Sequence, residues 1–406
     1  MRRGSYILAV LLLAAPAHAV EVEPVYTLQF LGGQYFFSEG QSKVSGNLSG
    51  LLAPGIRFNE RWELYPSLRS AYKGTKEVVD VVGAGTVFQE QMDHRLGVKG
   101  VYNPEGTKWR LKPSASYTAQ LLKETADESF GNGLFDYRKM DFGFEGEYVY
   151  RKPLAVRASV TYFMTHFPNY TSLESQASTD FQGQSLAREL VGDYVLDSHG
   201  QLLAFSGEYP FKGMLVEGGY TFMHQRFGDQ RIVDAAGALT PSSRHDIMHA
   251  VSGGVKYPHE FSAKFKAVGS FGVGFAINDS SQNNYDALRT HFVEDYYDYR
   301  EISVSPGLEL KVGDPDWPTT FCMDLNLAMR SFPGRFIQNE DGAYQGDNLS
   351  QTNFMISATA SRPIAPRFKV LFNVQHGIAR SNQEYEQLYT YNYSATSYLF
   401  GLSYDY

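Results

Sequence analysis

The strongest constraint in this sequence is an alternation of apolar and polar side chains that recurs in short runs along most of the chain. Residues two apart lie on the same face of an extended strand, so this period predicts strands with one apolar face. The clearest run is C-terminal. Its apolar face comprises Tyr398, Phe400, Leu402, Tyr404 and Tyr406. Its other face comprises Ser397, Gly401, Ser403, Asp405 and one apolar exception, Leu399.

A second run also fixes the register in which strands pair. From 321 to 330 every odd position is apolar, whereas the even positions include Asp324 and Arg330. A slip of one residue would move both charges into the apolar medium, so the register is strongly specified. Comparable runs occupy 141–150, 156–164 and 302–312. The sequence therefore predicts an all-β protein.

Two kinds of connection alternate between these runs. The tight kind is rich in turn-forming residues and lies at 59–61, 104–107, 151–153, 210–213, 258–260, 314–317 and 363–367. The long kind lies at about 38–45, 73–86, 124–135, 168–189, 226–245, 279–291, 333–348 and 382–389. Short periplasmic turns and long extracellular loops are the plan of outer-membrane barrels. Seven turns and eight loops predict a transmembrane, antiparallel, up-and-down β-barrel of about sixteen strands.

Two features leave the strand number open between fourteen and eighteen. The segment 190–209 is over-long for one strand and contains two glycines. Four prolines also fall inside predicted strands, where each removes a ladder donor. We expect bulges or bends at Pro54, Pro66, Pro113 and Pro306.

The first nineteen residues have the three parts of a removable secretory signal. Arg2 and Arg3 precede an apolar stretch over 6–15, and Ala17-His18-Ala19 supplies a small-residue cleavage site. The apolar stretch is too short to cross a bilayer as a helix. We expect residues 1–19 to be a signal peptide and residues 20–406 to form one transmembrane barrel domain.

The composition agrees with an exported barrel. Cys322 is the one cysteine, so an internal disulfide is impossible. Without the signal peptide, 34 basic residues face 44 acidic ones, and a formal charge of −10 argues against a nucleic-acid partner. The aromatic side chains should form belts near the turns. Trp62, Trp109 and Trp317 each flank a tight turn, a placement that ordinary core aromatics of a soluble β-protein do not explain together with a signal peptide.

The segment from Tyr398 to Tyr406 resembles the C-terminal signal of bacterial outer-membrane β-barrels, in which alternating hydrophobic residues end in an aromatic one. The resemblance implies recognition by the barrel assembly machinery through Tyr398, Phe400, Leu402, Tyr404 and Tyr406. Phe is the commoner last residue, so Tyr406 departs slightly from the pattern. The sixteen-strand plan resembles porins and, more distantly, the barrels of exopolysaccharide exporters. Neither likeness rests on a motif that identifies a substrate.

Charged residues on the strands fall on the face opposite to the apolar one. Each would cost about 2 to 4 kcal/mol if it faced lipid at mid-depth, so we expect these side chains to line a lumen. A wall of sixteen strands is too wide for side chains alone to fill, so water or a folded loop occupies the lumen. The basic positions are Arg57, Arg69, Arg95, Lys99, Arg110, Lys112, Lys139, Arg157, Lys256, Lys264, Lys266, Lys311, Arg330 and Lys369. The acidic positions are Glu63, Asp93, Asp141, Glu145, Glu147, Glu217, Glu309 and Asp324.

Two features of this lumen bear on selectivity. Basic patches near the periplasmic mouth, 99–112 and 256–266, should weakly favour anionic solutes, unless the charges are only a salt-bridged filler. The longest loop, 168–189, is polar but contains Leu173, Phe181, Leu186 and Ala187. It either folds inward and narrows the pore or remains a surface loop.

The sequence offers little for catalysis or metal binding. His94, His249 and His376 face outward near the outer interface, but none has a serine and an acid at a convincing spacing. An acidic cluster at 294–301 (Glu294, Asp295, Asp298, Glu301) lacks the glycine and ligand order of a calcium loop, so a solvated rim is the expected role. We expect no enzyme, no metal and no cofactor.

These observations predict an outer-membrane channel of a Gram-negative bacterium that passes hydrophilic solutes. An export barrel for a polysaccharide is the first alternative, favoured slightly by Tyr297 and Tyr299, which face inward. A plugged structural or adhesive barrel and an interfacial lipid enzyme are the others. The expected partners are outer-membrane lipid, lipopolysaccharide, the assembly machinery and a small solute or a polysaccharide.

Overall fold

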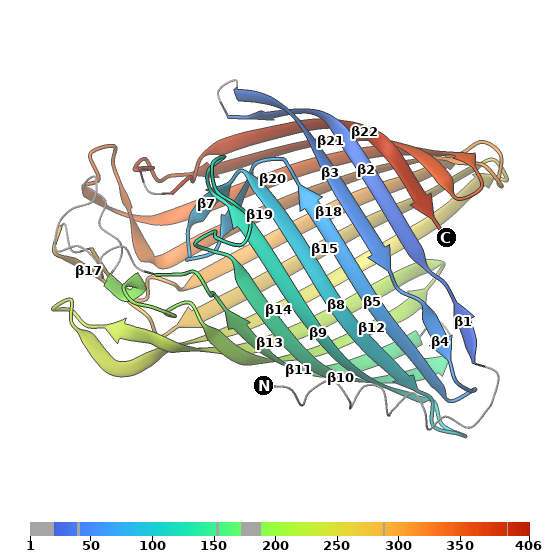
Figure 1. The fold of residues 1–406 in the computed structure, drawn as a ribbon, viewed down its shortest axis with the longest axis horizontal. Helices are drawn as coiled ribbons and strands as arrows, with labels where there is room; N and C mark the ends of the chain where they lie inside the picture. Colours follow the sequence, from blue (N-terminus) through green and yellow to red (C-terminus); the bar gives the residue numbers. More distant parts are fainter. Residues whose placement is uncertain (1–19, 39–40, 152–153, 172–187, 287–288, 388) are drawn as a thin grey trace.

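The computed structural model describes residues 20–38, 41–151, 154–171, 188–286, 289–387 and 389–406. In these ranges an antiparallel sheet closes on itself as a barrel (Figure 1), and no helix is long and apolar enough to cross a membrane. The wall has sixteen main strands, as predicted. They are β2 (Tyr26–Phe37), β3 (Gln41–Leu52), β5 (Trp62–Lys73), β8 (Glu90–Tyr102), β9 (Trp109–Lys123), β10 (Tyr137–Arg151), β11 (Leu154–His166), β12 (Ser198–Phe211), β13 (Met214–Val233), β14 (Leu239–Ser262), β15 (Phe265–Ser280), β18 (Tyr299–Val312), β19 (Thr319–Gln338), β20 (Tyr344–Ala365), β21 (Phe368–Ser381) and β22 (Tyr393–Asp405).

The barrel closes between its first and last wall strands. β2 and β22 pair antiparallel from Thr27 and Asp405 to Phe37 and Ala395. The aromatic rings of Tyr26 and Tyr406 stack at this seam, with centroids 4.8 Å apart. Closure leaves the wall without an unpaired edge, which a membrane-spanning sheet requires because hydrocarbon offers no hydrogen-bond partners.

Pro54 is the point at which a wall strand breaks. β3 ends at Leu52, and the short strand β4 (Gly55–Arg57) continues beside β5 after the proline. β1 (Glu21–Glu23) pairs with β4 and lengthens the sheet at this end. The bend predicted at Pro54 is confirmed.

The other three prolines remain inside their strands. Pro66 and Pro113 pair with Val98 and Phe144 without any shift of register, so the bulges expected there are wrong. Pro306 interrupts the pairing of β18 with β19 but does not shift it. A strand residue directs its N–H to one neighbour only, so a proline removes one ladder bond and leaves the surrounding register intact.

The two ends of the barrel differ. In Figure 1 the tight turns and the C-terminus lie at the right-hand end, and the long loops lie at the left. The turn between β12 and β13 has Lys212 and Gly213 at positive φ, 48° and 82°, as a two-residue type I′ turn requires. In outer-membrane barrels the short-turn end faces the periplasm.

One tight turn lies four residues beyond its predicted place. β14 continues through 258–260 to Ser262, and the turn consists of Ala263 and Lys264. The prediction of a turn at Pro258 is wrong. β14 pairs with β13 only as far as Lys256, which lies opposite Leu215. Pro258 lies beyond this pair, so its missing N–H removes no hydrogen bond to β13.

Several predicted long loops are partly strand. β13 ends at 233 and β14 begins at 239, so both strands extend into the loop expected at 226–245. β19 ends at 338 and β20 begins at 344, so both extend into the loop expected at 333–348. β3 begins at Gln41, inside the loop expected at 38–45, whereas β12 begins only at Ser198 within the segment 190–209. In the long hairpins the buried positions of these extensions include polar side chains such as Gln230 and Arg335, so the alternation that reveals strands disappears.

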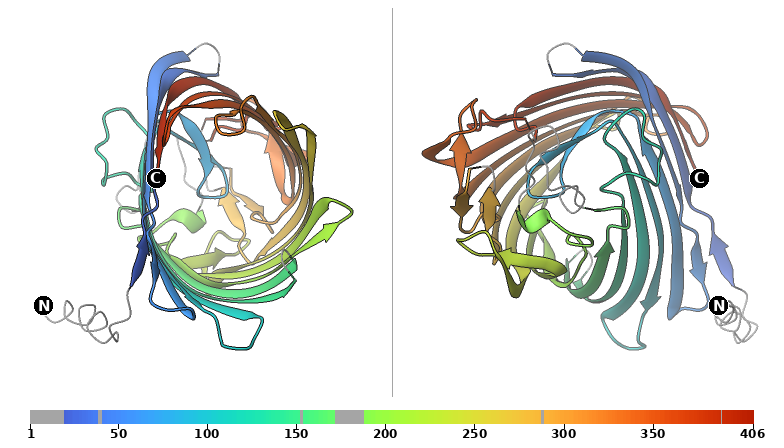
Figure 2. Two further views of the ribbon diagram at one scale, coloured as in Figure 1. Left: turned by 90° about the vertical axis from the view of Figure 1, so that its right-hand side faces the viewer. Right: turned by 60° about the vertical axis from the view of Figure 1, so that its left-hand side comes forward.

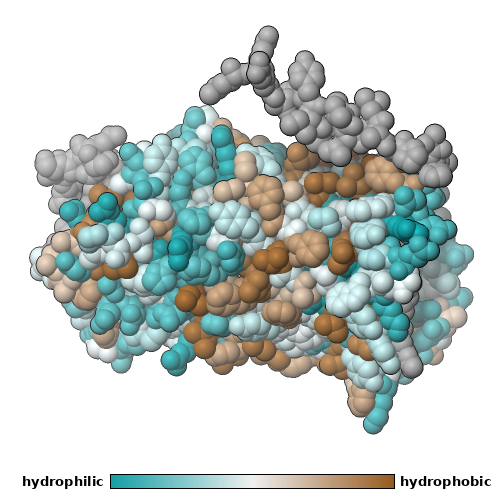
Figure 3. Space-filling model, turned by 90° about the horizontal axis from the view of Figure 1, so that it is seen from below, coloured by the Kyte–Doolittle hydropathy of each residue, from teal (hydrophilic) through white to brown (hydrophobic). Residues whose placement is uncertain are grey.

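The outer face of the wall is apolar. Large side chains alternate outward on every wall strand, and Phe30, Val156 and Phe400 are 57%, 54% and 59% exposed. Figure 3 shows hydrophobic side chains across the central and right-hand part of one face, with hydrophilic ones dominating the loop end at the left. Aromatic pairs border the turns: Trp62 stacks on Tyr102 with centroids 4.4 Å apart. Such an exposed surface is stable only against lipid.

We predict opposite effects for two adjacent substitutions in β19. Leu325 lies on the apolar face about midway across the band, and Asn326 on the opposite face donates to Ser305 Oγ at 2.9 Å. Leu325→Arg should lower the free energy of unfolding from lipid vesicles by about 2 to 4 kcal/mol, because it places a charge in hydrocarbon. Asn326→Arg should cost much less. Denaturant titration checks both, and equal costs would contradict the assignment of the two faces.

Candidate functional site

A β-hairpin from the loop between β5 and β8 lies inside the barrel. β6 (Glu77–Asp80) and β7 (Gly85–Phe88) pair with each other in a separate two-strand sheet. Figure 2 shows this hairpin, in light blue, within the ring of wall strands. The segment EVVDVVGAGTVF has β-branched residues on both sides of a glycine-containing turn, a pattern that favours a hairpin. The β6–β7 hairpin therefore occupies space that the wall leaves open.

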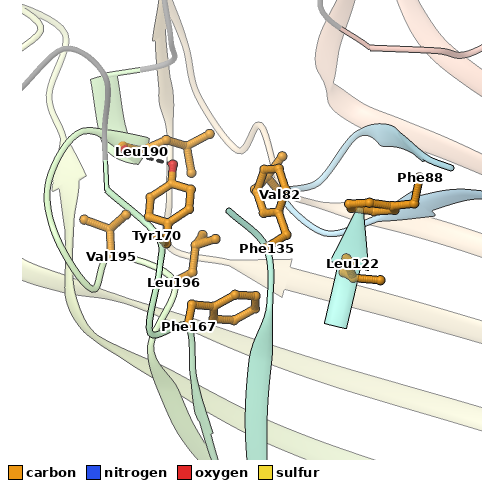
Figure 4. Close-up of a cluster of buried hydrophobic side chains, with 9 residues drawn as sticks. All are labelled: Val82, Phe88, Leu122, Phe135, Phe167, Tyr170, Leu190, Val195 and Leu196. Atoms are coloured by element: carbon orange, nitrogen blue, oxygen red, sulfur yellow. Dashed lines mark hydrogen bonds between the residues drawn. The ribbon is translucent and has the colours of Figure 1, made fainter. Parts of the chain in front are cut away.

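A hydrophobic cluster fixes the β6–β7 hairpin to one side of the wall (Figure 4). Its buried members come from the hairpin, from β9 and from two further loops: Val82, Phe88, Leu122, Phe135, Phe167, Tyr170, Leu190, Val195 and Leu196. The Tyr170 hydroxyl donates to the Leu190 carbonyl at 3.0 Å and joins the two ends of the loop after β11. Burial of apolar surface is the main stabilisation available to loops inside a lumen.

The longest loop was one candidate for narrowing the pore. Its described ends pack into the cluster of Figure 4, whereas Leu173, Phe181, Leu186 and Ala187 lie outside the described residues. The described segment that crosses the lumen is the β6–β7 hairpin, which was not predicted. Its sequence signal was the pair of β-branched runs around Gly83-Ala84-Gly85.

Polar contacts fix the hairpin to the opposite wall. Arg330 of β19 donates to Asp80 Oδ2 at 3.0 Å and to Glu301 Oε2 at 2.9 Å. Arg335, also of β19 and nearly fully buried, donates to the carbonyl of Gly83 and, at 2.6 Å, to that of Tyr296. Charge-assisted hydrogen bonds of this kind are stronger than neutral ones. The hairpin is therefore held on two sides of the barrel.

A buried polar network holds the loop after β11. Glu189, in the 3-10 helix η2 (Arg188–Leu190), accepts from Asn284 Nδ2 at 2.8 Å and from the Tyr297 hydroxyl at 2.9 Å. Asn284 belongs to a second loop hairpin, β16 (Asn284–Asp286) and β17 (His291–Val293). The guanidinium of Arg244 lies over the Tyr297 ring, 4.1 Å from its centroid, and pairs with both oxygens of Asp246 at 2.6 and 2.9 Å. Burial raises the pKa of the Glu189 carboxyl.

A cavity of about 400 Å³ lies between the hairpin and the wall. It is lined by Val79 and Asp80 of the hairpin and by side chains of β9 to β13, among them Gln120, Lys139 and Asp141. Lys139 and Asp141 form an ion pair at 3.2 Å. The polar face of these strands therefore borders an interior space that the hairpin narrows.

Most of the predicted lumen residues lie on wall strands, on the face opposite to the exposed apolar side chains. Two positions differ: Arg57 lies on the short strand β4, and Lys264 lies in the turn between β14 and β15 and belongs to no strand face. The positions on strands are Arg57, Arg69, Arg95, Lys99, Arg110, Lys112, Lys139, Arg157, Lys256, Lys266, Glu309, Lys311, Asp324, Arg330 and Lys369.

Carboxylates neutralise the first basic patch. Glu147 is 5% exposed and pairs with Arg110, Lys112 and Arg157 at 3.2, 2.8 and 2.7 Å. Lys112 also pairs with Glu145 at 2.7 Å. These residues occupy neighbouring positions on β9, β10 and β11, so the cross-strand register brings them together. Sequence spacing identified the charges but not their partners.

The remaining predicted basic residues are mostly paired on the surface of the same face. Glu217 lies 3.1 Å from Lys256, Glu260 3.4 Å from Lys266, Glu309 2.9 Å from Lys311 and Asp405 2.9 Å from Lys369. Arg57 pairs with Glu21 and Glu63 at 3.1 and 3.4 Å. Exposed pairs of this kind contribute little to stability. They do remove the excess positive charge that would favour anionic solutes.

The outward histidines singled out in the sequence each contact a hydroxyl. His94, His249 and His376 lie 2.8 Å through Nδ1 from Ser70 Oγ, the Tyr220 hydroxyl and Thr396 Oγ1. In a serine hydrolase a third group orients the histidine. No carboxylate or amide side chain of the described residues hydrogen-bonds to His94, so the Ser70–His94 pair lacks that group.

The acidic cluster at 294–301 is dispersed in the structure. Asp298 accepts from the Ser280 amide at 2.6 Å, whereas Glu301 pairs with Arg330. Within the part of the chain that the structure describes, no three His, Cys, Asp or Glu side chains are placed to hold a metal ion.

A closed sixteen-strand sheet with an apolar outer face and a charged inner one defines a class of protein: the chain is an outer-membrane β-barrel of the porin-like plan, located in the outer membrane of a Gram-negative bacterium.

Comparison with known proteins adds the following. No protein-family model and no curated protein sequence matches the chain. Among solved structures, the trimer form of OmpT, an outer membrane protein of Vibrio cholerae, is 12% identical over 96% of this chain and 100% of its own, with a TM-score of 0.47. OccD3 (OpdP) of Pseudomonas aeruginosa is 9% identical over 96% and 93%, TM-score 0.47. OmpF of Salmonella typhi is 10% identical over 95% and 97%, TM-score 0.44. Because each score is below 0.5, the class rests on the barrel geometry alone.

We predict that Glu147 is the most important acidic residue of the wall for stability. Glu147→Gln removes a negative charge that pairs with Lys112, which is 13% exposed and therefore poorly hydrated. The substitution should lower the free energy of unfolding by about 3 to 5 kcal/mol. Glu217→Gln is the matched control, since its pair with Lys256 is exposed at both ends and should cost no more than about 1 kcal/mol. Unfolding from lipid vesicles measures both. Equal losses would contradict the network.

We predict that docking of the loop at Glu189 weakens as the pH rises. The neutral carboxyl is favoured in the docked state, so docking is strongest below the ordinary carboxyl pKa of about 4.3 and weakens as the pH rises through the raised pKa. Hydrogen exchange of residues 188–197, corrected for the intrinsic rate, should accelerate accordingly. Asp298, whose pKa burial raises to about 6, titrates nearby, so Glu189→Gln should remove only part of the dependence. A Glu189→Gln profile identical to the unmodified one would contradict the assignment.

Proposed function

We propose that this protein is a channel that passes small hydrophilic solutes across the outer membrane, through a lumen narrowed by the β6–β7 hairpin. The observation that carries the proposal is the cavity between the hairpin and β9 to β13, with Gln120, Lys139 and Asp141 in its lining. Polar groups in the lining of an otherwise apolar cavity would let hydrophilic solutes cross the narrowed lumen without a covalent step. The predicted lumen residues named above would form its wall.

The arrangement of charge supports selection of solutes by their size more than by the sign of their charge. Lys112, Arg110 and Arg157 meet Glu147, and Arg330 meets both Glu301 and Asp80, so each of these four positive groups has a negative group on the same side of the lumen. Facing groups of opposite charge orient dipolar solutes and screen each other from a distant ion. We therefore replace the expected preference for anions with one for small polar or zwitterionic solutes.

The polysaccharide-export alternative loses its main support. The Tyr297 hydroxyl donates to Glu189, and its ring is 4% exposed beneath Arg244. The Tyr299 ring lies under the guanidinium of Arg330, 4.2 Å from its centroid. The Tyr297 phenol is therefore not presented to a passing sugar chain, and the Tyr299 phenol is half-buried, with its hydroxyl 3.9 Å from Met248 Sδ. A plugged structural or adhesive barrel remains as the competing function, favoured by the inward-folded loops.

Planar-bilayer conductance of the refolded protein tests the proposal. Stable single-channel steps are expected, together with swelling of liposomes in small neutral sugars. Asp80→Asn should increase the open fraction, because it weakens a partly exposed contact with Arg330 worth about 1 kcal/mol, a change of about fivefold in population.

The control for this experiment is Arg95→Gln. Arg95 lies on the same inner face and donates to Ser116 Oγ at 3.2 Å, and within the described residues it makes no hydrogen bond or ion pair with the hairpin. It should leave the open fraction unchanged. A complete absence of conductance and solute flux would reject the channel and favour the plugged barrel.

We also propose that the chain reaches its membrane by the usual route of this class. Residues 1–19 would be the removed signal, although they lie outside the described residues. The barrel assembly machinery would recognise β22 through Tyr398, Phe400, Leu402, Tyr404 and Tyr406. The exposure of Tyr398, Phe400 and Leu402 on the outer face supports this.

A further inference from the structure

Three histidines and an arginine lie side by side on the outer face of β12, β13 and β14. The strand register places His199 opposite Arg226, and Arg226 opposite His245. His224 lies two residues before Arg226 and therefore on the same face. His199, Arg226 and His245 are exposed, and His224 is half-buried. Four basic or titratable side chains thus form one outward patch.

The patch borders a cleft in the outer surface. Adjoining cavities of about 560 and 250 Å³ share His199, His224 and Arg226 in their linings, and the larger one also reaches His245. A bulge on β13 opens this space: residues 227–230 separate Arg226 from the next paired position, Arg231, whereas one residue separates their partners on β14. Bulges re-aim side chains and often lie beside functional sites.

The side chains of the patch are unpartnered, unlike those of the other outward histidines. His94, His249 and His376 each have a hydroxyl at 2.8 Å. The imidazoles of His199, His224 and His245 make only ring contacts within the described chain, such as His224 to His245 with centroids 6.5 Å apart. Arg226 has no ion pair with any described residue. The cleft therefore presents hydrogen-bond donors without protein acceptors.

The depth of the cleft is that of a lipid headgroup. On β12 the outward residues from the turn are Phe211, Tyr209, Phe205 and Leu203, followed by Gln201 and His199. A tilted strand crosses the apolar band in roughly ten residues, and His199 lies twelve residues from Phe211. The patch thus begins where the apolar band ends, on the side of the long loops.

The charged groups around the cleft leave Arg226 at its centre unpaired. On β11 the nearest outward charge, His166, is paired with Asp197 at 2.5 Å. On β15, Asp279 lies opposite Ile247 at one side, and the β13 bulge carries Asp229 and Arg231, both exposed. Arg226 at the centre has no carboxylate partner among these groups. An anionic ligand would find there one permanent positive charge and several imidazole donors.

We propose that this cleft binds a phosphate monoester on the headgroup of a phosphorylated glycolipid in the outer leaflet. Arg226 pairs with the phosphate, and His199, His224 and His245 donate to its remaining oxygens. The acyl chains of the lipid lie along Leu203, Phe205 and Phe222 below. The shared chemistry is that of a phosphate group, and the position at the edge of the apolar band favours a lipid as its source over free phosphate.

Native mass spectrometry of the full mature protein in neutral detergent tests the proposal with three probes: diphosphorylated lipid A, its dephosphorylated form and inorganic phosphate. Diphosphorylated lipid A should remain bound. Arg226→Gln and the double variant His199→Gln, His245→Gln should each weaken its binding by about tenfold, as expected for loss of about 1.4 kcal/mol. His376→Gln, an outward histidine with its own hydroxyl partner, should leave binding unchanged.

Three results would overturn the proposal. They are equal retention of the phosphorylated and dephosphorylated lipids, unchanged binding in the cleft variants, and displacement of the lipid by an equimolar amount of inorganic phosphate, which would indicate a free-anion site. Heat-modifiable migration on gels confirms that each variant is folded. Single-channel conductance should be the same in all of them, so failure here is separable from failure of the channel.

Discussion

The wall of this barrel depends on one requirement: each backbone N–H and C=O in hydrocarbon must be hydrogen-bonded within the sheet, because lipid provides no partner. The β2–β22 seam satisfies it by joining the two ends of the sheet. Closure in turn gives every strand one lipid face and one interior face, and this is why alternation persists from Leu28 to Tyr404. Register, turn placement and the position of the aromatic side chains all follow from that division.

Closure with sixteen strands creates a second problem, since the interior is too wide for side chains to fill. The structure fills it with loops. The β6–β7 hairpin crosses the lumen between the hydrophobic cluster and the β19 arginines, so apolar burial holds one side and ion pairs hold the other. Charged wall residues meet opposite charges across neighbouring strands, and the same polar face that keeps the lumen hydrated also stabilises it.

The sequence predicted the features that a local pattern reports. Sixteen strands, the outward face of β19 and β22, and five of the six predicted turns that lie within the described residues follow from side-chain period and turn residues, whereas the turn predicted at 151–153 lies largely outside those residues. The strand extensions at 226–233 and 333–338 did not, because the buried positions there include polar side chains such as Gln230 and Arg335, and the apolar period is lost. Neither did the site: Arg330 and Asp80 are 250 residues apart, and no local pattern connects them. Pro258 shows why one turn was predicted in the wrong place. A proline indicates a position where no ladder hydrogen bond is needed, and such positions occur both at turns and beyond the end of a neighbouring strand.

The bulge of β13 connects the two faces of the wall. On its inner side, Arg244 lies over Phe227 and Tyr297 and belongs to the network that holds Glu189. On its outer side, the same extra residues separate Arg226 from Arg231 and open the cleft. A change in the spacing of these strands would move both at once. The cleft outside and the docked loop inside therefore share one backbone segment.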